Sequence, residues 1–147
     1  MIRNPLKKLF LLKVLLAGAV GLPAIGWAAD SENFVGKVDM TTEIAAKANP
    51  NGALFVFAKK VGEESAPPAA VIRIDHPQYP VTFRLRPEDQ MRPGDPAKPF
   101  EGEYILYARH SDTGTPMEKK GYHGESCGSV VAGEGSPMIV ISSEYEE

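Results

Sequence analysis

The sequence predicts an all-β fold, a two-sheet β-sandwich of about seven short strands preceded by a signal peptide. Apolar and β-branched residues occur in runs of strand length, and several runs alternate with polar residues. The 14 glycines and 13 prolines mostly fall between the runs, at turn positions. No amphipathic pattern of useful helical length interrupts them. Short alternating strands with short connections are typical of two packed sheets, and a small closed barrel is the alternative.

The first strand and the turn after it are predicted near the start of the exported chain. Residues 34–40 alternate in polarity, as expected for a half-buried strand. Thr41 or Thr42 can cap a brief helical turn through residues 43–47. Pro50-Asn51-Gly52 then predicts a tight turn.

Three further strands are predicted before residue 86. Residues 53–58 form an apolar, β-branched and aromatic run, and residues 59–68 form a polar loop that ends in two prolines. Residues 69–74 and 79–85 alternate, and Pro80 places the start of the second of these at a sheet edge. The residues expected to face the core from these two strands are Ala70, Ile72, Ile74, Val81, Phe83 and Leu85.

The last third of the chain is less regular. Residues 86–100 contain four prolines and predict an irregular segment. Residues 103–109 predict a strand with Tyr104, Leu106 and Ala108 on one face. A turn at 111–115 and a polar excursion through residue 125 follow. The remaining predicted elements are strands at 129–132 and 138–141 and a charged tail at 144–147.

The N-terminal 28 residues have the order of a secretory signal peptide. Residues 1–13 carry four basic residues and no acid, and residues 14–22 form an uninterrupted apolar run before Pro23. Small residues then precede a cleavage point after Ala28. A spanning helix needs about 20 apolar residues, so cleavage is favoured over a retained membrane anchor. The predicted location is the periplasm, with membrane contact only if the signal is retained.

Composition narrows the possible partners. Removing the signal peptide leaves 119 of the 147 residues, enough for one domain. All 19 acidic residues but only 12 of the 16 basic ones lie beyond residue 28, which gives a net charge of −7. An acidic chain without a basic cluster excludes nucleic acid as a partner. The single cysteine, Cys127, excludes an internal disulfide and is either buried or able to pair with another chain. We expect a monomer.

The residue types of a copper site are present. Cupredoxins, which are small exported β-sandwiches, bind copper with two His, one Cys and a weak Met ligand. Such a site would here use His110, His123, Cys127 and Met117, or Met138 in place of Met117. The order of these residues differs from the late Cys-His-Met loop of cupredoxins, so our expectation is no metal and no cofactor. The histidines, which stand beside turn residues, are then expected to be solvent-exposed.

No constellation predicts catalysis. Ser126 lies at the centre of Gly124-Glu-Ser-Cys-Gly128, which has the Gly-x-Ser-x-Gly spacing of a nucleophile elbow. That elbow needs a strand before the serine and a helix after it, whereas here we expect a polar loop before it and a strand after it. Paired acids such as Glu63-Glu64 fall in hydrophilic loops. We therefore predict a non-enzymatic protein with no catalytic residue.

Binding through a sheet surface is the remaining functional hypothesis. Arg73, Arg84 and Arg86 project from strand faces that are expected to be wet. Tyr104 and Tyr107 fall on opposite faces of one strand, so one of them lies near the surface. Arginine and aromatic side chains are common anchors of protein interfaces. These five residues are the predicted partner-binding set, and ordinary surface decoration is the alternative.

Several core segments together resemble a known module. The chain is similar to the C-terminal Ig-like, or cupredoxin-like, domain of the cytochrome c-type biogenesis protein H family. The segments that carry the resemblance are Gly36–Val38, Ile44–Lys47, Leu54–Ala58, Pro68–Ile74, Pro80–Leu85, Met91–Gly94, Ile105–Arg109, Ser111 and Gly114. In that family the domain is the periplasmic end of a membrane-anchored protein with helical repeats, which serves haem ligation to apocytochrome c.

The resemblance implies an Ig-like domain over residues 34–143, followed by an acidic tail at 144–147. It implies a non-enzymatic periplasmic accessory or protein-binding module linked to c-type cytochrome biogenesis or another redox assembly. Its partner would be another periplasmic protein, such as a cytochrome or its assembly factor. No metal-binding or catalytic residue comes with the family. A copper-binding cupredoxin-like protein is the alternative function.

Overall fold

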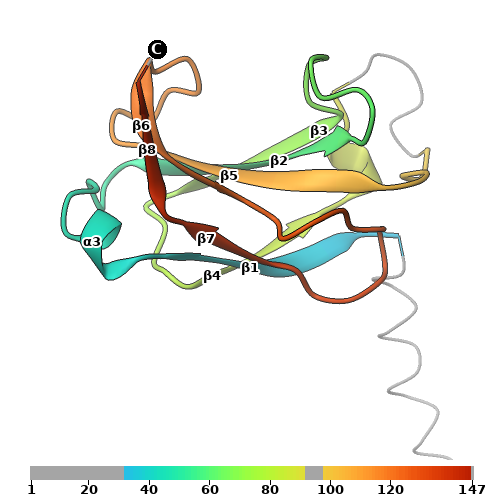
Figure 1. The fold of residues 1–147 in the computed structure, drawn as a ribbon, viewed down its shortest axis with the longest axis horizontal. Helices are drawn as coiled ribbons and strands as arrows, with labels where there is room; N and C mark the ends of the chain where they lie inside the picture. The colour runs from blue at the N-terminus through green and yellow to red at the C-terminus, as the bar shows by residue number, and fades with distance from the viewer. Residues whose placement is uncertain (1–31, 92–97, 147) are drawn as a thin grey trace, which may run out of the picture. The chain divides into compact units, whose positions relative to one another are not determined.

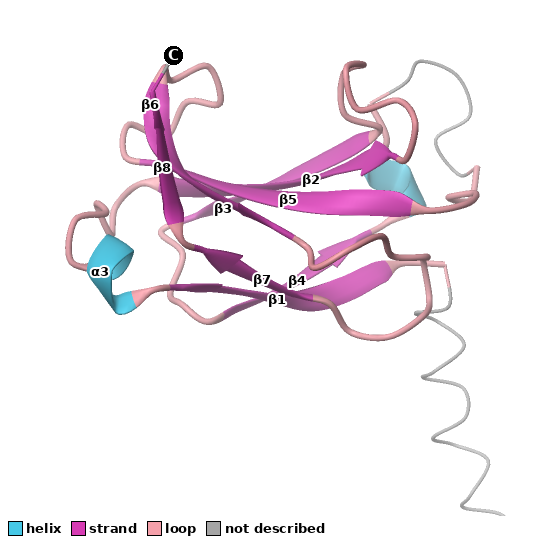
Figure 2. Cartoon of the chain, in the orientation of Figure 1, coloured by secondary structure: helices cyan, strands magenta, loops and turns pink. Residues whose placement is uncertain are grey.

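Two β-sheets face each other in this protein (Figure 1). The structure, a computed structural model, describes residues 32–91 and 98–146. Within these residues eight strands form a three-stranded and a five-stranded sheet, and helical turns occur only in the connections (Figure 2). The prediction of an all-β sandwich is confirmed. The predicted signal peptide at residues 1–28 lies outside the described residues.

The smaller sheet has the strand order β4-β1-β7. β1 (Phe34–Met40) lies in the middle, antiparallel to β4 (Val81–Leu85) and parallel to β7 (Met138–Ile141). The first strand of the domain is therefore paired with its last strand but one.

The larger sheet has the strand order β3-β2-β5-β6-β8, and all of its neighbours are antiparallel. Its strands are β3 (Ala70–Asp75), β2 (Ala53–Lys60), β5 (Tyr104–Ser111), β6 (Lys120–Glu125) and β8 (Ser143–Glu146). The last two strands in this order, β6 and β8, rise together away from the smaller sheet (Figure 1).

The core lies between the two sheets and follows the predicted alternation. In β4, Val81, Phe83 and Leu85 are buried while the residues between them are exposed. In β5, the face that was predicted to hold Tyr104, Leu106 and Ala108 is the buried one. The buried cluster also contains Phe34, Val38, Ile44, Leu54, Val56, Ala58, Ala70, Tyr104, Ile139 and Ile141.

Three sequence predictions at the C-terminal end were wrong. The polar excursion contains strand β6, and the acidic tail at 144–147 is largely strand β8, which pairs with β6. Residues 129–132 contribute only an isolated bridge, in which the Tyr104 amide donates to the carbonyl of Val130 at 2.9 Å. β6 and β8 carry few apolar side chains, so their pairing depends on backbone hydrogen bonds and leaves no alternation in the sequence.

Two helical turns connect strands. The helix α3 (Thr42–Ala45) begins where the Thr41 hydroxyl accepts a hydrogen bond from the Ile44 amide at 3.3 Å. This confirms Thr41 as the cap, one of the two predicted threonines. The 3₁₀ turn η1 (Pro87–Asp89) follows β4.

The two sheets meet closely where β6 passes β7. Only Ser142 separates β7 from β8, so the chain crosses from one sheet to the other within one residue. At the crossing, a Cβ atom on Gly124 would lie 2.1 Å from the carbonyl oxygen of Val140. No side chain fits at that distance, which explains a glycine in the middle of β6.

Candidate functional site

The outer face of the five-stranded sheet carries rows of side chains from neighbouring strands. In one row, Phe57 of β2 stands between Val71 of β3 and Tyr107 of β5, and Tyr107 stands opposite Glu125 of β6. Phe57, Val71 and Tyr107 are partly exposed, whereas the alternate residues of these strands face the core. The sequence therefore places aromatic side chains where an open sheet face meets solvent.

Phe57 and Tyr107 form a stacked pair. Their ring centroids are 5.2 Å apart and the ring planes differ by 14°. Desolvation raises the pKa of the Tyr107 hydroxyl, and the carboxylates of Glu125 and Glu64 raise it further. The Tyr107 hydroxyl consequently stays protonated and can donate a hydrogen bond at the edge of the stacked Phe57–Tyr107 pair. We call Phe57, Val71 and Tyr107 the aromatic face.

Arg73 borders the aromatic face in the next row. Its guanidinium carbon lies 5.4 Å from the centre of the Phe55 ring, and its Nε donates to Asp75 at 2.7 Å. A second guanidinium nitrogen donates to the carbonyl of Gly114. The arginine covers Phe55, which is buried, and is held in one orientation by these contacts.

Arg109 extends the same row toward β8. Its guanidinium carbon lies 3.9 Å from the centre of the Tyr145 ring, and one of its nitrogens donates to the carbonyl of Glu118 at 3.2 Å. His123 stands opposite Arg109 across the β5–β6 pair, and its ring meets Tyr145 edge-on. Sequence analysis did not single out Arg109 and Tyr145, because their contact joins residues far apart in the chain.

The predicted partner-binding residues separate into three places. Arg73 and Tyr107 lie together on the outer face of the five-stranded sheet. Arg84 is exposed on the three-stranded sheet, and Arg86 lies just beyond β4, 3.5 Å from the Asp89 carboxylate. Tyr104 faces the core, where its ring meets Phe34 and Phe100. Of the two tyrosines on β5, Tyr107 is therefore the one near the surface.

The four candidate copper ligands are not brought together. His110 faces the core and His123 is exposed on the outer face, so the sheet separates them. Cys127 is exposed in the loop after β6, and Met117 is 85% exposed before it. In residues 32–91 and 98–146 no group of three or more His, Cys, Asp and Glu side chains could hold a metal ion. These four residues therefore do not form one site in the described part of the chain.

His110 is buried, contrary to the expectation of a solvent-exposed loop residue. Its Nε2 lies 2.9 Å from the Asn49 carbonyl, which can only accept, so Nε2 carries the proton. Nδ1 then accepts from the Tyr79 hydroxyl at 2.8 Å. The Asn49 amide in turn donates to Asp112 at 2.7 Å. The histidine ring therefore links β5 to the segments that contain Asn49 and Tyr79, and Asn49 links to Asp112. Neither ring nitrogen is left for a ligand.

We expect alkaline pH to weaken the protein through Tyr79. Burial raises the pKa of its hydroxyl well above the ordinary value of about 10. Above that pH the unfolded chain loses the proton while the folded state keeps it, so the free energy of unfolding falls as pH rises. Urea unfolding between pH 8 and 11.5 should show a steeper decline for wild type than for Tyr79→Phe. Parallel declines would contradict this role, because both proteins share the other tyrosines.

Ser126 does not lie in a nucleophile elbow, and its hydroxyl is used in hydrogen bonds within the protein. Its hydroxyl accepts from the Leu106 amide at 3.1 Å and donates to the Gly128 carbonyl at 2.8 Å. The residue is buried at the end of β6, and a loop rather than a helix follows it. The first hydrogen bond fastens the start of that loop to β5, and the second holds the turn within the loop.

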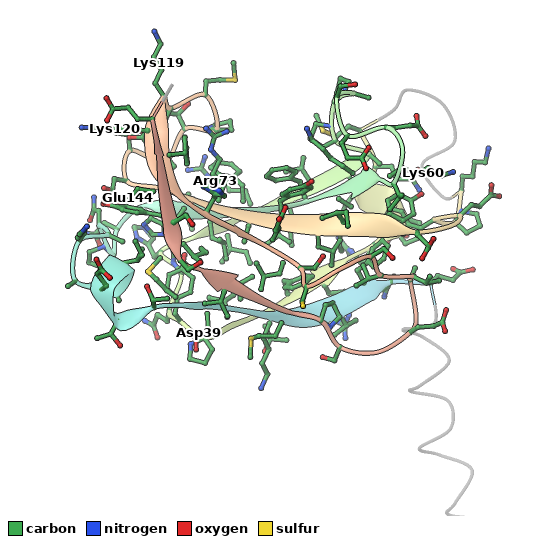
Figure 3. The ribbon with its side chains drawn as sticks, viewed as in Figure 1. Asp39, Lys60, Arg73, Lys119, Lys120 and Glu144 are labelled. Atoms are coloured by element: carbon green, nitrogen blue, oxygen red, sulfur yellow. The ribbon has the colours of Figure 1, made fainter. Side chains whose placement is uncertain are left out.

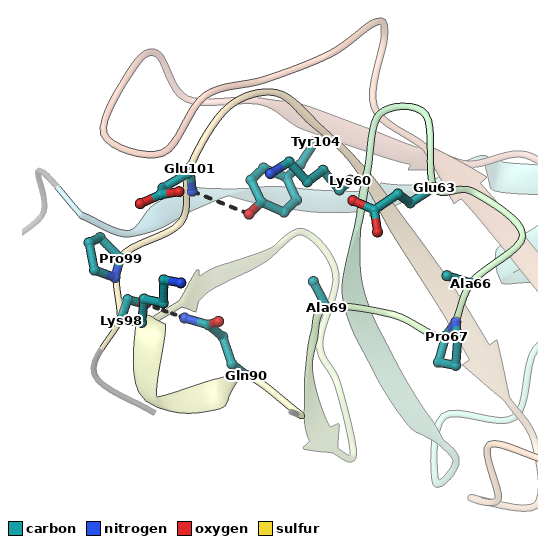
Figure 4. Close-up of a pocket in the computed structure, with 10 residues that line it drawn as sticks. All are labelled: Lys60, Glu63, Ala66, Pro67, Ala69, Gln90, Lys98, Pro99, Glu101 and Tyr104. Atoms are coloured by element: carbon teal, nitrogen blue, oxygen red, sulfur yellow. Dashed lines mark hydrogen bonds between the residues drawn. The ribbon is translucent and has the colours of Figure 1, made fainter. Parts of the chain in front are cut away.

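A cavity of about 510 Å³ (Figure 4) lies at the end of the sandwich that carries Lys60, opposite the end that carries Lys120 and Glu144 (Figure 3). Its floor includes the Tyr104 hydroxyl, which accepts from the Glu101 amide at 3.3 Å. Lysines and glutamates alternate around it, with Lys60 and Lys98 set against Glu63 and Glu101. The mixed charges suit no single class of ligand.

A comparison with models of known protein families shows which family this chain belongs to. A family model described as the cytochrome c-type biogenesis protein H Ig-like domain matches residues 35–141. The chain belongs to this family. The match runs from β1 to the end of β7, so β8 of this Ig-like domain lies beyond the matched residues. No curated protein and no solved structure matches the chain.

The described part of the Ig-like domain contains no helix that is long and apolar enough to cross a membrane.

Proposed function

We propose that this Ig-like domain is a non-enzymatic, periplasmic protein-binding module in cytochrome c biogenesis, and that the aromatic face binds the partner. The family supports the link to cytochrome c biogenesis. The observation that carries the binding role is the stacked Phe57–Tyr107 pair, partly exposed on an open sheet face. The order of residues 1–28, which is that of a signal peptide, supports the periplasm.

The aromatic face has the physical features of an interface centre. Aromatic rings bury a large area while few rotatable bonds become fixed, and stacking already restricts both rings before a partner arrives. Arg73 beside them is held by Asp75 and Gly114, so little further ordering is needed. Charged side chains such as Glu125 stand at the border, where interfaces are usually polar.

Recognition would consist of surface complementarity, with no chemical step. The groups that might suggest catalysis are already hydrogen-bonded within the protein: Ser126 to the start of its loop and His110 to Tyr79 and Asn49. These contacts support a non-enzymatic role. The partner is a periplasmic protein, a c-type cytochrome or one of its assembly factors.

Removing the Tyr107 ring should abolish co-purification of that partner. The affinity-tagged protein is isolated from the periplasm of its own host, and retained proteins are identified by mass spectrometry. Wild type should retain a c-type cytochrome or an assembly factor, and Tyr107→Ser should lose it, since a central aromatic typically contributes 2 kcal/mol or more, roughly a 30-fold change in affinity.

Thr82→Ala is the matched control, because Thr82 is exposed on a strand of the other sheet. It should retain the same proteins as wild type. The proposal is wrong if Tyr107→Ser, shown to be folded by circular dichroism, retains the partner as well as wild type does. It is also wrong if wild type retains no protein of cytochrome c biogenesis.

A further inference from the structure

A hollow of about 420 Å³ lies where β6 and β8 rise away from the three-stranded sheet (Figure 1). This volume is within the range of about 300–1,000 Å³ that is usual for ligand pockets. The residues that line it are Asp112, Glu118, Lys120, Gly121, Tyr122, Glu144, Tyr145 and Glu146. We call it the tyrosine–carboxylate hollow. It combines two aromatic side chains with four carboxylates and one lysine.

The register shows why these side chains gather here. Tyr122 stands opposite His110, whose side chain faces the core, so Tyr122 points to the inner side of the sheet. Glu144 stands opposite Tyr122, and Lys120 opposite Glu146, so all four share that inner side. Most inward positions elsewhere in this sheet are apolar, and His110 is an exception. Polar residues at this end indicate an inner face that is open to solvent and not covered by the sandwich.

The charged side chains of the hollow act on the Tyr122 hydroxyl. Burial raises the pKa of the Tyr122 hydroxyl, and the Asp112 and Glu144 carboxylates raise it further. Lys47 opposes this effect through a 3.3 Å ion pair with Glu144, but both partners are about half exposed, so the pair compensates only weakly. Four carboxylates line the hollow against the single ammonium group of Lys120, so acidic groups outnumber basic ones around the tyrosine ring.

The geometry favours an organic cation over a metal ion. Among the described residues no three carboxylates, histidines or cysteines converge closely enough to hold a metal. A lysine ammonium or an arginine guanidinium can instead lie against an aromatic ring and donate hydrogen bonds to separated carboxylates.

The neighbouring strand suits an extended segment that carries such a cation. β8 is the last strand in the order of the larger sheet, so one of its backbone edges faces outward. An edge strand can pair with an added strand, while its side-chain pockets select residues of that strand. The acidic exported chain, with its net charge of −7 after residue 28, also attracts a basic partner.

We propose that the tyrosine–carboxylate hollow receives a lysine or arginine side chain from an extended basic segment of another protein. Tyr122, Glu144, Lys120 and Glu146 line the hollow from the inner side of the sheet, and Tyr145 lines it from the outer side, where it contacts Arg109. None of the three residues of the aromatic face lines the hollow, so this inference does not depend on the function proposed for that face.

NMR titration of the ¹⁵N-labelled exported chain with penta-lysine tests the proposal. We expect saturable shifts of backbone amides in residues 120–122 and 144–146, which weaken as salt is added. Glu144→Gln with Glu146→Gln should weaken binding about tenfold, because two charge-assisted contacts are lost. Tyr122→Leu, which keeps every charge, should weaken it about threefold through the lost ring–cation contact.

Glu88→Gln with Glu134→Gln is the matched control, because it removes the same charge at exposed positions outside the hollow. It should leave penta-lysine binding within about twofold of wild type, as expected for screened distant charges. The proposal is overturned if this control weakens binding as much as the hollow variant does. It is also overturned if shifts spread evenly over all acidic segments. Tyr107→Ser should bind penta-lysine normally, which separates this test from that of the aromatic face.

Discussion

Replacing Gly124 with alanine is expected to destabilise the domain by about 3 kcal/mol. The new methyl group would lie 2.1 Å from the Val140 carbonyl oxygen and 2.7 Å from the carbonyl carbon. Both atoms belong to the backbone of β7, so no side-chain rotation can relieve the contact. β6 and β7 would have to separate at the point where the two sheets meet. Urea unfolding followed by circular dichroism measures the loss as a lower midpoint.

Glu125→Ala is the appropriate comparison for Gly124→Ala. It changes the next residue of the same strand, where the side chain is exposed, so the midpoint should move little. Equal stability of Gly124→Ala and wild type would show that β6 does not approach β7 as closely as described.

Replacing His110 with alanine is expected to cost about 3–5 kcal/mol. A buried side chain as large as this leaves a cavity when truncated. The Tyr79 hydroxyl and the Asn49 carbonyl each lose a hydrogen-bond partner, and an unsatisfied buried polar group costs about 1–3 kcal/mol. Chemical unfolding at pH 8 measures the loss.

Two further variants distinguish what the packing of the His110 ring contributes to stability from what its hydrogen bonds contribute. Tyr79→Phe keeps the packing but leaves Nδ1 of His110 without its donor, so about 1–2 kcal/mol should be lost. His123→Ala removes the exposed histidine of the neighbouring strand and should change stability by less than about 0.5 kcal/mol. If His110→Ala were no more costly than His123→Ala, the buried network would have no structural role.

The strands that were predicted from the sequence are those that bury one face. β4 alternates Val81, Phe83 and Leu85 with exposed residues, and a period of two identifies both the strand and its inner side. β6 and β8 could not be found in this way. The sequences Lys-Gly-Tyr-His-Gly-Glu and Ser-Glu-Tyr-Glu each contain one partly buried tyrosine, on opposite sides of the sheet, and no apolar run. Their pairing is decided by backbone hydrogen bonds between distant segments.

The candidate sites were predicted only in part, for a similar reason. Alternation along β5 correctly separated Tyr107 from Tyr104, because a strand fixes which residues share a side. Turn residues beside His110 suggested exposure, but its burial depends on Asn49 and Tyr79, which are far away in the chain. Local sequence cannot reveal such partners, and the tyrosine–carboxylate hollow was missed for the same reason.

The parallel pairing of β1 with β7 sets a condition on when the domain can finish folding. Lys37 is paired with Met138, so the central strand of the smaller sheet gains its second neighbour only when the chain as far as β7 is available. Contacts between such remote segments form slowly, because a long loop must close before they contribute. A chain that emerges from its N-terminus therefore leaves one backbone edge of β1 unpaired until β7 arrives, and during that interval it is most open to chaperones, proteases and self-association.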